Sequence, residues 1–202
     1  MLEIVNEDDD EYWSIDCIKY EIYNLSTDSW REIDAVVPRA LHSLCFELFF
    51  NGACHMLSRR AYFGPIILCF AISSEVFTII DFPESCSELD GKHSSLTVLN
   101  ECLAMVRYQE WMKEPRLIDI WVMKEYGVKE SWIKQFIVGP ILLMCPLSSW
   151  KNYMLLMESG DGQLVSCELN TNTFKKFEIY SDRINSLRVI IFKESLVSRI
   201  NT

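Results

Sequence analysis

YGVKESWIKQF (Tyr126–Phe136) is one of four copies of a short unit in which an apolar strand end, a polar turn and an aromatic residue follow one another. The remaining copies are LSTDSWREI (Leu25–Ile33), ISSEVFTII (Ile72–Ile80) and LNTNTFKKF (Leu169–Phe177). In each copy, small, polar or charged residues form the turn, and the aromatic residue opens an alternating strand. This order is typical of a β-hairpin. The chain therefore contains four related hairpins.

The spacing of the copies indicates how the hairpins are assembled. The intervals between their anchor aromatics are 47, 55 and 42 residues, and the anchors are Trp30, Phe77, Trp132 and Phe174. Hairpins that recur at roughly 40 to 50 residues point to propeller blades rather than to a solenoid of short repeats. We therefore predict an all-β fold, a propeller-like array of about four antiparallel β-blades that forms a partial propeller. A propeller is usually a binding platform, so the repeat also favours a binding protein over an enzyme.

Strand-like stretches around the hairpins predict the limits of the blades. The blade repeats lie near residues 45–82, 96–138 and 141–179. Two further hairpins, 18–33 and 187–200, each lack the other half of a blade, and together they could make one composite blade. Such a blade would close a ring without leaving an exposed edge strand. Residues 18–202 are expected to form one domain, and residues 1–17 an acidic leader that can be disordered.

Acidic residues are concentrated at the start of the chain. The net charge of the 202 residues is −10, yet residues 1–34 hold 11 Asp or Glu against only Lys19 and Arg31. This segment would repel a nucleic-acid backbone, so we expect no nucleic-acid partner. EDDDE (Glu7–Glu11) has two readings that the sequence leaves open. It is either a solvated leader or a local negative field that speeds the encounter with a basic partner.

The chain carries neither a secretion signal nor a membrane segment that we can identify. Its start, MLEIVNEDDDEYW, lacks the basic and apolar regions of a signal peptide. We therefore expect a cytoplasmic protein whose eight cysteines are reduced thiols. Ile66–Ile72 is the longest apolar stretch without Gly or Pro, and it is far shorter than the ~20 residues of a membrane helix. No membrane partner is expected.

Motifs for catalysis, cofactors or metals are absent from the sequence. It contains no GxGxxG, phosphate-loop or GxSxG motif, and no pair of cysteines has CxxC spacing. The nearest zinc candidates are Cys45, Cys54 and His55, where cysteine is more often a small buried apolar residue. We therefore predict no catalytic residue, no cofactor and no metal, and we expect that the protein is not an enzyme.

Aromatic and charged side chains supply the candidate contact residues. Trp30 and Trp132 occupy the repeat position, which favours packing between blades. Trp13, Trp111 and Trp150 lie outside the repeat, and for these a core position and a surface anchor both stay open. Charged loop residues are ordinarily solvated, but on one rim of a propeller they would form a recognition surface. The candidate partner-binding residues are Asp8, Asp9, Asp10, Arg59, Arg60, Glu84, Asp90, Lys92, Lys113 and Arg116.

Several longer stretches resemble a known family. They are NGACHMLSR, ILCFAISSEVF, LTVLNECLAMV, DIWVMKEYGVKESWIKQF, PLSSWKNYMLLMESGDGQLVSCELN and SLRVIIFKESLV, in this order. Over about residues 18–200 the chain resembles the C-terminal F-box-associated domain of plant S-locus F-box proteins. WVMKEYGVKESW and FKESL carry the likeness to plant F-box-associated domains. Met56 stands where relatives commonly have Trp, and Ala71 where they commonly have Asp.

The resemblance implies a function. In that family an F-box recruits a cullin-type E3 ubiquitin ligase, and the associated domain captures the protein to be ubiquitinated. For S-locus members the captured protein is the basic pistil S-ribonuclease, in self-incompatibility between pollen and pistil. The resemblance therefore implies a substrate-recognition domain with a basic protein target. No F-box helices precede residue 18, so the ligase core would be reached only through an F-box that these residues lack.

Two other functions stay open at the level of the sequence. The chain could be a truncated product that is non-functional or purely structural. It could also be a glycan-binding F-box-associated domain, which would need exposed aromatic side chains that line a pocket.

Overall fold

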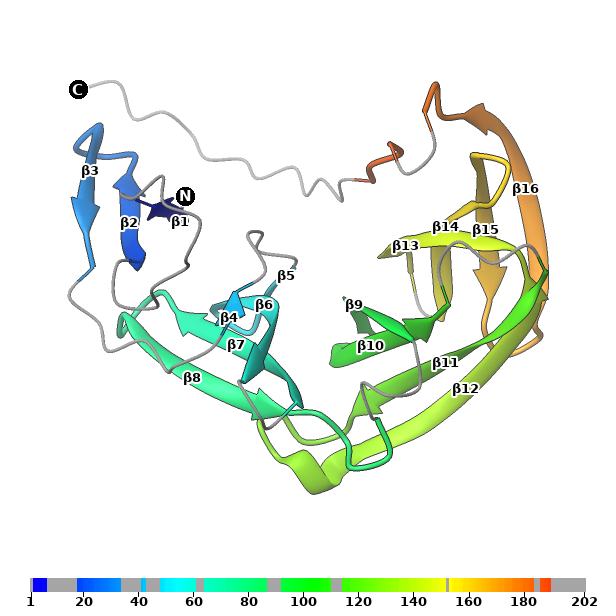
Figure 1. The fold of residues 1–202 in the computed structure, drawn as a ribbon, viewed down its shortest axis with the longest axis horizontal. Helices are drawn as coiled ribbons and strands as arrows, with labels where there is room; N and C mark the ends of the chain where they lie inside the picture. The colour runs from blue at the N-terminus through cyan, green and yellow to red at the C-terminus, as the bar shows by residue number, and fades with distance from the viewer. Residues whose placement is uncertain are drawn as a thin grey trace.

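The described chain is built almost entirely from β-strands. The computed structural model describes residues 2–6, 18–33, 41–42, 48–60, 64–86, 92–109, 114–151, 153–183 and 186–189. Within these residues the only helical element is the short 3-10 helix η3 (Lys129–Ser131). Four antiparallel sheets follow one another around an open arc (Figure 1). The prediction of an all-β, propeller-like array of about four blades is confirmed.

Each sheet runs from an inner strand to an outer one. The first sheet has the order β1-β2-β3, with β1 Leu2–Asn6, β2 Ile18–Asn24 and β3 Ser29–Glu32. The second contains β4 Leu41–His42, β5 Leu48–Phe50, β6 Ala53–Arg60, β7 Gly64–Ala71 and β8 Val76–Asp81. The third contains β9 His93–Leu99, β10 Cys102–Tyr108, β11 Arg116–Met123 and β12 Trp132–Ile141. The fourth contains β13 Leu143–Ser149, β14 Met154–Ser159, β15 Gln163–Glu168 and β16 Thr173–Tyr180.

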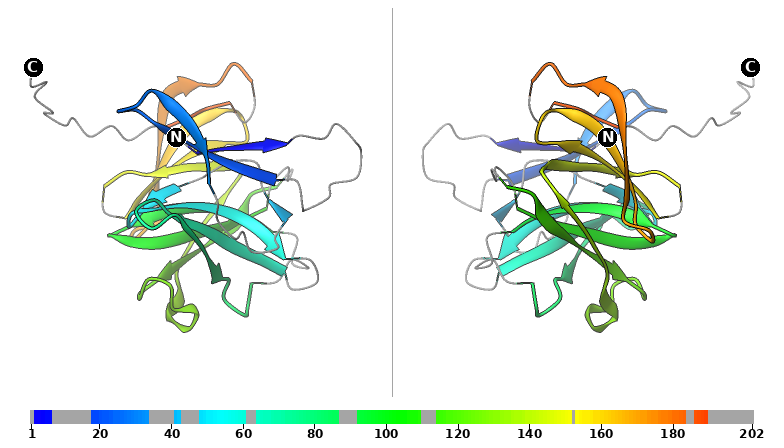
Figure 2. Two further views of the ribbon diagram at one scale, coloured as in Figure 1. Left: turned by 90° about the vertical axis from the view of Figure 1, so that its left-hand side faces the viewer. Right: turned by 90° about the vertical axis from the view of Figure 1, so that its right-hand side faces the viewer.

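The outer strands β3, β8, β12 and β16 form the convex rim of the arc (Figure 1). The side views show how strongly the strands twist relative to one another within each sheet (Figure 2). Tight turns join the strands, and the Asn51–Gly52 turn between β5 and β6 has positive φ at both residues, 50° and 74°. Asn-Gly is the preferred sequence for such a hairpin. The local sequence therefore dictates this connection.

The sheet limits can be set beside the expected ones. The second, third and fourth sheets span residues 41–81, 93–141 and 143–180, where the repeat pattern predicts blades near 45–82, 96–138 and 141–179. Residues 2–6 form β1, which pairs with β2, so this part of the expected leader is a strand instead. Residues 7–17 lie outside the described residues. The composite blade stays a prediction, because residues 190–202 also lie outside them.

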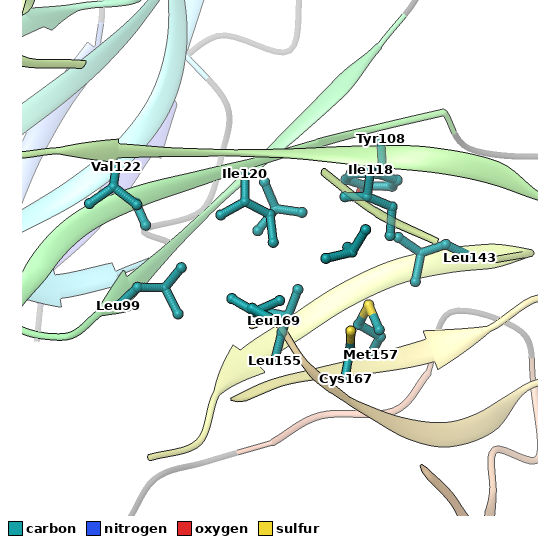
Figure 3. Packing of buried hydrophobic residues seen from close by; sticks show 13 residues of the cluster. Leu99, Tyr108, Ile118, Ile120, Val122, Leu143, Leu155, Met157, Cys167 and Leu169 are labelled. Carbon is teal, nitrogen blue, oxygen red and sulfur yellow. The ribbon is translucent and has the colours of Figure 1, made fainter. Parts of the chain in front are cut away.

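Three apolar clusters hold neighbouring sheets together. The cluster between the third and fourth sheets is drawn in Figure 3, where Ile118, Ile120 and Val122 of β11 face Leu155 and other residues of β14 and β15. A second cluster joins the second and third sheets through residues such as Ile67, Met105 and Trp132. A third, around Met56 and Phe77, joins the first and second sheets. Each fully buried Leu or Ile contributes roughly 1.5–3 kcal/mol, so these interfaces dominate the stability of the fold.

The anchor aromatics have a common position in these interfaces. Each is the first or second residue of the outer strand of its sheet. Phe77 and Trp132 are buried, Phe174 is half-buried, and all three pack into the cluster that their sheet shares with the preceding sheet. The prediction that Trp30 also packs between blades is wrong. Trp30 is 39% exposed and lies against the ring of Tyr23, because no sheet precedes the first one in the described chain.

A polar contact to the preceding sheet accompanies Phe77, Trp132 and Phe174, and we call it the interblade clasp. In the second sheet, Glu75 of the β7–β8 turn forms an ion pair with Arg31 at the end of β3. In the third, the indole Nε1 of Trp132 donates a hydrogen bond to the carbonyl oxygen of Asp81 at 3.1 Å. In the fourth, the side chain of Asn172 bonds to the backbone N–H and C=O of Gly139 at 2.9 and 2.8 Å. The hairpins of the second, third and fourth sheets thus each contact the outer strand of the preceding sheet.

The clasp of the third sheet is the most extensive of the three. Tyr126 reaches from the β11–β12 loop to the second sheet, where its hydroxyl lies 2.7 Å from Nε2 of the buried His55. The ring of Phe50 contacts both side chains. Burial raises the pKa of Tyr126 to about 12, so its hydroxyl stays protonated at neutral pH. These contacts give the WVMKEYGVKESW stretch a structural role as the link between two sheets.

His55 should make the stability of the fold sensitive to mild acid. Burial lowers the pKa of His55 below its ordinary value of 6.5. At a pH between these two pKa values, the unfolded chain binds a proton at His55 that the folded chain does not. The free energy of unfolding is therefore highest above pH 6.5 and decreases as the pH falls below 6.5. We expect the urea midpoint of the wild type to decrease from pH 7 to pH 5. His55→Gln, which cannot titrate, should flatten this decrease.

A matched control separates His55 from the other histidines. His93 is exposed and lies outside the His55–Tyr126 contact, so His93→Gln serves as the matched control for the substitution itself. An equally steep decrease in His55→Gln and in the wild type would show that another group titrates in this range.

Candidate partner-binding surface

The structure describes the side chains of only some of the predicted contact residues. Glu84, Lys92 and Arg116 are among them. Arg59 and Arg60 are the last two residues of β6, and only their backbone is described. The others, Asp8, Asp9, Asp10, Asp90 and Lys113, lie outside the described residues. Their role in binding stays a prediction.

Lys92 belongs to a charged cluster on the third sheet. Its Nζ lies 2.5 Å from Oδ2 of Asp119, and Nζ of Lys134 lies 3.3 Å from the same oxygen. Lys134 also sits over the ring of Trp121, 5.4 Å from its centroid. Burial alone would raise the pKa of Asp119, but the two lysines outweigh it and hold that pKa below its ordinary value of 3.8. The carboxylate is therefore ionised at neutral pH and fixes both ammonium groups.

Two exposed apolar side chains flank this cluster. Ile137 is directly opposite Asp119 in the β11–β12 pairing, and Leu117 lies two residues before Asp119 on β11. Leu117 is 54% exposed and Ile137 is 56% exposed. We call Lys92, Leu117, Lys134 and Ile137 the β11–β12 surface. Apolar side chains framed by charged ones are a combination that protein interfaces use.

Glu84 and Arg116 lie at more open positions. Glu84 is 89% exposed and its Oε1 is 3.6 Å from Nζ of Lys129, which places it beside the clasp of the third sheet. Arg116 begins β11, and its Nη2 is 3.5 Å from Oε2 of Glu114. Exposed ion pairs of this kind contribute little to stability. Glu84 and Arg116 can therefore leave these ion pairs and contact groups of another protein at a small cost in free energy.

Sequence reasoning missed three members of the β11–β12 surface. Leu117, Lys134 and Ile137 belong to strands that read as ordinary alternating segments. Alternation assigns a residue to a face of the sheet, but it does not say how far the neighbouring sheet covers that face. Trp150 is an exposed aromatic outside the repeat, at 43%, and Nζ of Lys151 lies 5.1 Å from its ring centroid. Trp13 and Trp111 lie outside the described residues.

The described residues contain no group of three or more His, Cys, Asp or Glu that could hold a metal ion. Of the zinc candidates, His55 bonds to Tyr126, Cys54 carries a free thiol, and Cys45 lies outside the described residues. Cys69, Cys102 and Cys167 also carry free thiols. In the part of the chain that the structure covers, no helix is long and apolar enough to cross a membrane.

Comparison with known proteins identifies the family. The model of the F-box associated beta propeller domain matches residues 1–199. The F-box protein CPR1 of Arabidopsis thaliana is 26% identical over 210 residues, which cover 94% of this chain and 48% of that protein. The F-box protein At3g07870 of Arabidopsis thaliana is 32% identical over 150 residues, which cover 66% of this chain and 34% of that protein. The chain thus spans about half the length, or less, of these curated relatives. It belongs to the family of F-box associated beta propeller domains.

Proposed function

We propose that this domain captures a protein and presents it to a ubiquitin ligase that is recruited through an F-box. The observation that carries the proposal is the family match over residues 1–199, together with relatives that are F-box proteins. The domain would act as an adaptor in the cytoplasm, and catalysis would belong to the ligase. The β11–β12 surface and the residues near Glu84 supply contact groups of both charge signs and two exposed apolar side chains. These features suit a protein target.

We further propose that the target is basic. Residues 1–34 carry a net charge of −9, from 11 acidic and 2 basic residues, while the remaining residues are close to neutral. A charge concentrated in this way attracts an oppositely charged protein over a distance. The resemblance to S-locus F-box proteins names the pistil S-ribonuclease as the first target to test, with a role in self-incompatibility.

Association with that target should depend strongly on salt. We expect the association rate, measured by stopped-flow or biolayer interferometry with S-ribonuclease, to fall at least about tenfold between low salt and 0.15 M, because the Debye length shortens to about 8 Å. The dissociation rate should change less. The triple variant Asp8→Asn, Asp9→Asn, Asp10→Asn should reproduce much of this decrease at low salt.

A matched variant and a second protein control for the total charge. Glu101→Gln, Glu130→Gln and Glu178→Gln together remove three exposed carboxylates from the third and fourth sheets, and this variant should associate nearly as fast as the wild type. An acidic protein of similar size should not bind. An association rate that changes neither with salt nor with the Asp8–Asp10 substitutions would contradict charge steering. An absence of S-ribonuclease binding would contradict the proposed target.

A further inference from the structure

His55 carries the one buried side-chain nitrogen or oxygen atom that has no hydrogen-bond partner within the described residues. Its side chain is fully buried, and the unpaired atom is Nδ1. The other ring nitrogen, Nε2, lies 2.7 Å from the Tyr126 hydroxyl of the third sheet. Buried polar atoms are nearly always paired, so an exception calls for an explanation. This exception lies at the contact between the second and third sheets.

Uncharged side chains surround the imidazole of His55. Leu48 of β5 and Cys69 of β7 are directly opposite His55 in the two strand pairings of β6. The ring centroids of Phe50 and Tyr126 lie 6.3 and 5.7 Å from that of His55. Burial raises the pKa of the Cys69 thiol and of the Tyr126 hydroxyl to about 12, so both groups are neutral below pH 8. The titratable groups that face His55 therefore supply no negative charge.

The charged residues of the neighbouring elements do not pair with His55. In the β11–β12 loop they are exposed or half-buried, and they are Lys124, Glu125, Lys129 and Glu130. Strand β9 has one titratable residue, His93, which is exposed and lies against the ring of Tyr108. The charged residues of β6 itself, Arg59 and Arg60, end that strand, and only their backbone is described. No carboxylate among the described side chains forms an ion pair with His55.

We propose that protonation of His55 opens its contact with Tyr126, so that this contact acts as an acid-sensitive latch between two blades. A protonated imidazole has two N–H donors and a positive charge. In the closed latch, Nε2 has the Tyr126 oxygen as its acceptor, whereas Nδ1 has none and the charge has no counter-charge. Burial accordingly lowers the pKa of His55 and outweighs the opposing effect of the Leu48 and Ala53 backbone groups. An open latch lets water solvate the imidazolium.

Opening the latch moves only a small part of the interface. Tyr126 belongs to a loop and is 39% exposed, whereas Trp132 and the rest of the cluster between the two sheets are buried. The Tyr126 side chain can therefore leave the imidazole while the cluster stays packed. Local openings of this kind need less free energy than global unfolding, so acid populates the open latch first. The thiol of Cys69, which also hydrogen-bonds to Tyr126, becomes accessible in that state.

The experiment compares the labelling rates of two buried thiols. Cys69 lies beside the latch, and Cys167 lies in the cluster between the third and fourth sheets. The thiol reagent 4,4′-dithiodipyridine, followed by mass spectrometry of the peptides, gives each rate. We expect the ratio of the Cys69 rate to the Cys167 rate to rise about three- to tenfold from pH 7.5 to pH 5.5. About tenfold is the limit when His55 has its ordinary pKa of 6.5 in the open state.

Two variants test whether His55 is the sensor. The rise in the ratio should be absent from His55→Gln and present in the matched control His93→Gln. If circular dichroism at pH 7.5 shows that His55→Gln does not fold, His55→Leu takes its place. A constant ratio in the wild type would overturn the proposal, even if both rates rise together, because acid would then act through global unfolding alone. A rise that persists without the imidazole of His55 would also overturn it.

Discussion

Trp132→Ala should lower the free energy of unfolding by about 3–5 kcal/mol, the range for removing a large aromatic side chain from a core. Trp132 is only 6% exposed and lies in the cluster between the second and third sheets. Its indole N–H also donates to the carbonyl oxygen of Asp81, which would lose this partner in the variant. Domains of this size are stable by about 5–15 kcal/mol, so the variant would retain only part of that stability. Urea unfolding followed by circular dichroism measures the loss.

Trp30→Ala is the matched comparison. Trp30 occupies the same position of the repeat, but it is 39% exposed and its main aromatic contact is Tyr23, at 5.2 Å between ring centroids. We expect a loss of about 1 kcal/mol, in the range of a partly exposed aromatic pair. Equal losses in the two variants would contradict the difference in packing. Trp132→Phe keeps most of the apolar volume and should recover more than half of the loss.

The hairpin repeat predicted the blades because each hairpin is specified locally. Turn residues such as Asn51 and Gly52 and the alternation of β8 or β12 are properties of a few neighbouring residues. The same repeat gave a wrong position for Trp30, since burial depends on whether another sheet lies next to the hairpin. Strand β1 was missed for a related reason. It has only five residues and is followed directly by EDDDE, whose charge dominates the composition of the segment.

The candidate surface was predictable only in part. Charged loop residues such as Lys92 and Glu84 stand out in the sequence because they lie in a polar stretch between two apolar strands. The sequence does not show that the Lys92 ammonium pairs with the Asp119 carboxylate. Nor does it show that Glu84, which follows the second sheet, forms an ion pair with Lys129 of the third. Leu117 and Ile137 look like core residues of a strand, and their exposure arises because the preceding sheet does not cover the outer strands here. These contacts join residues far apart in the chain, which a pattern of neighbours cannot contain.

Gly139→Ala should destabilise the fold by about 3–5 kcal/mol, because two separate costs add at this position. The first cost is conformational, since Gly139 has a φ of +110°, which residues with a side chain rarely adopt. The second is steric. A Cβ at Gly139 would lie 2.8 Å from the carbonyl oxygen of Arg116 and 3.0 Å from the backbone nitrogen of Ile141. Both are main-chain atoms of the β11–β12 pair, so the strands themselves would have to move.

Two variants separate these costs from the loss of the clasp. Gly127 has a φ of +83°, but a Cβ there meets nothing within 4 Å, so Gly127→Ala carries only the conformational cost of about 1–2 kcal/mol. Asn172→Gly removes both hydrogen bonds to Gly139 while it tolerates the positive φ of 52° at residue 172, and it should cost about 1–3 kcal/mol. If the steric cost is real, the loss in Gly139→Ala exceeds that in either variant. A loss in Gly139→Ala no larger than that in Gly127→Ala would contradict the steric cost, because it would mean that β11 and β12 can shift locally to accept the Cβ at little cost in free energy.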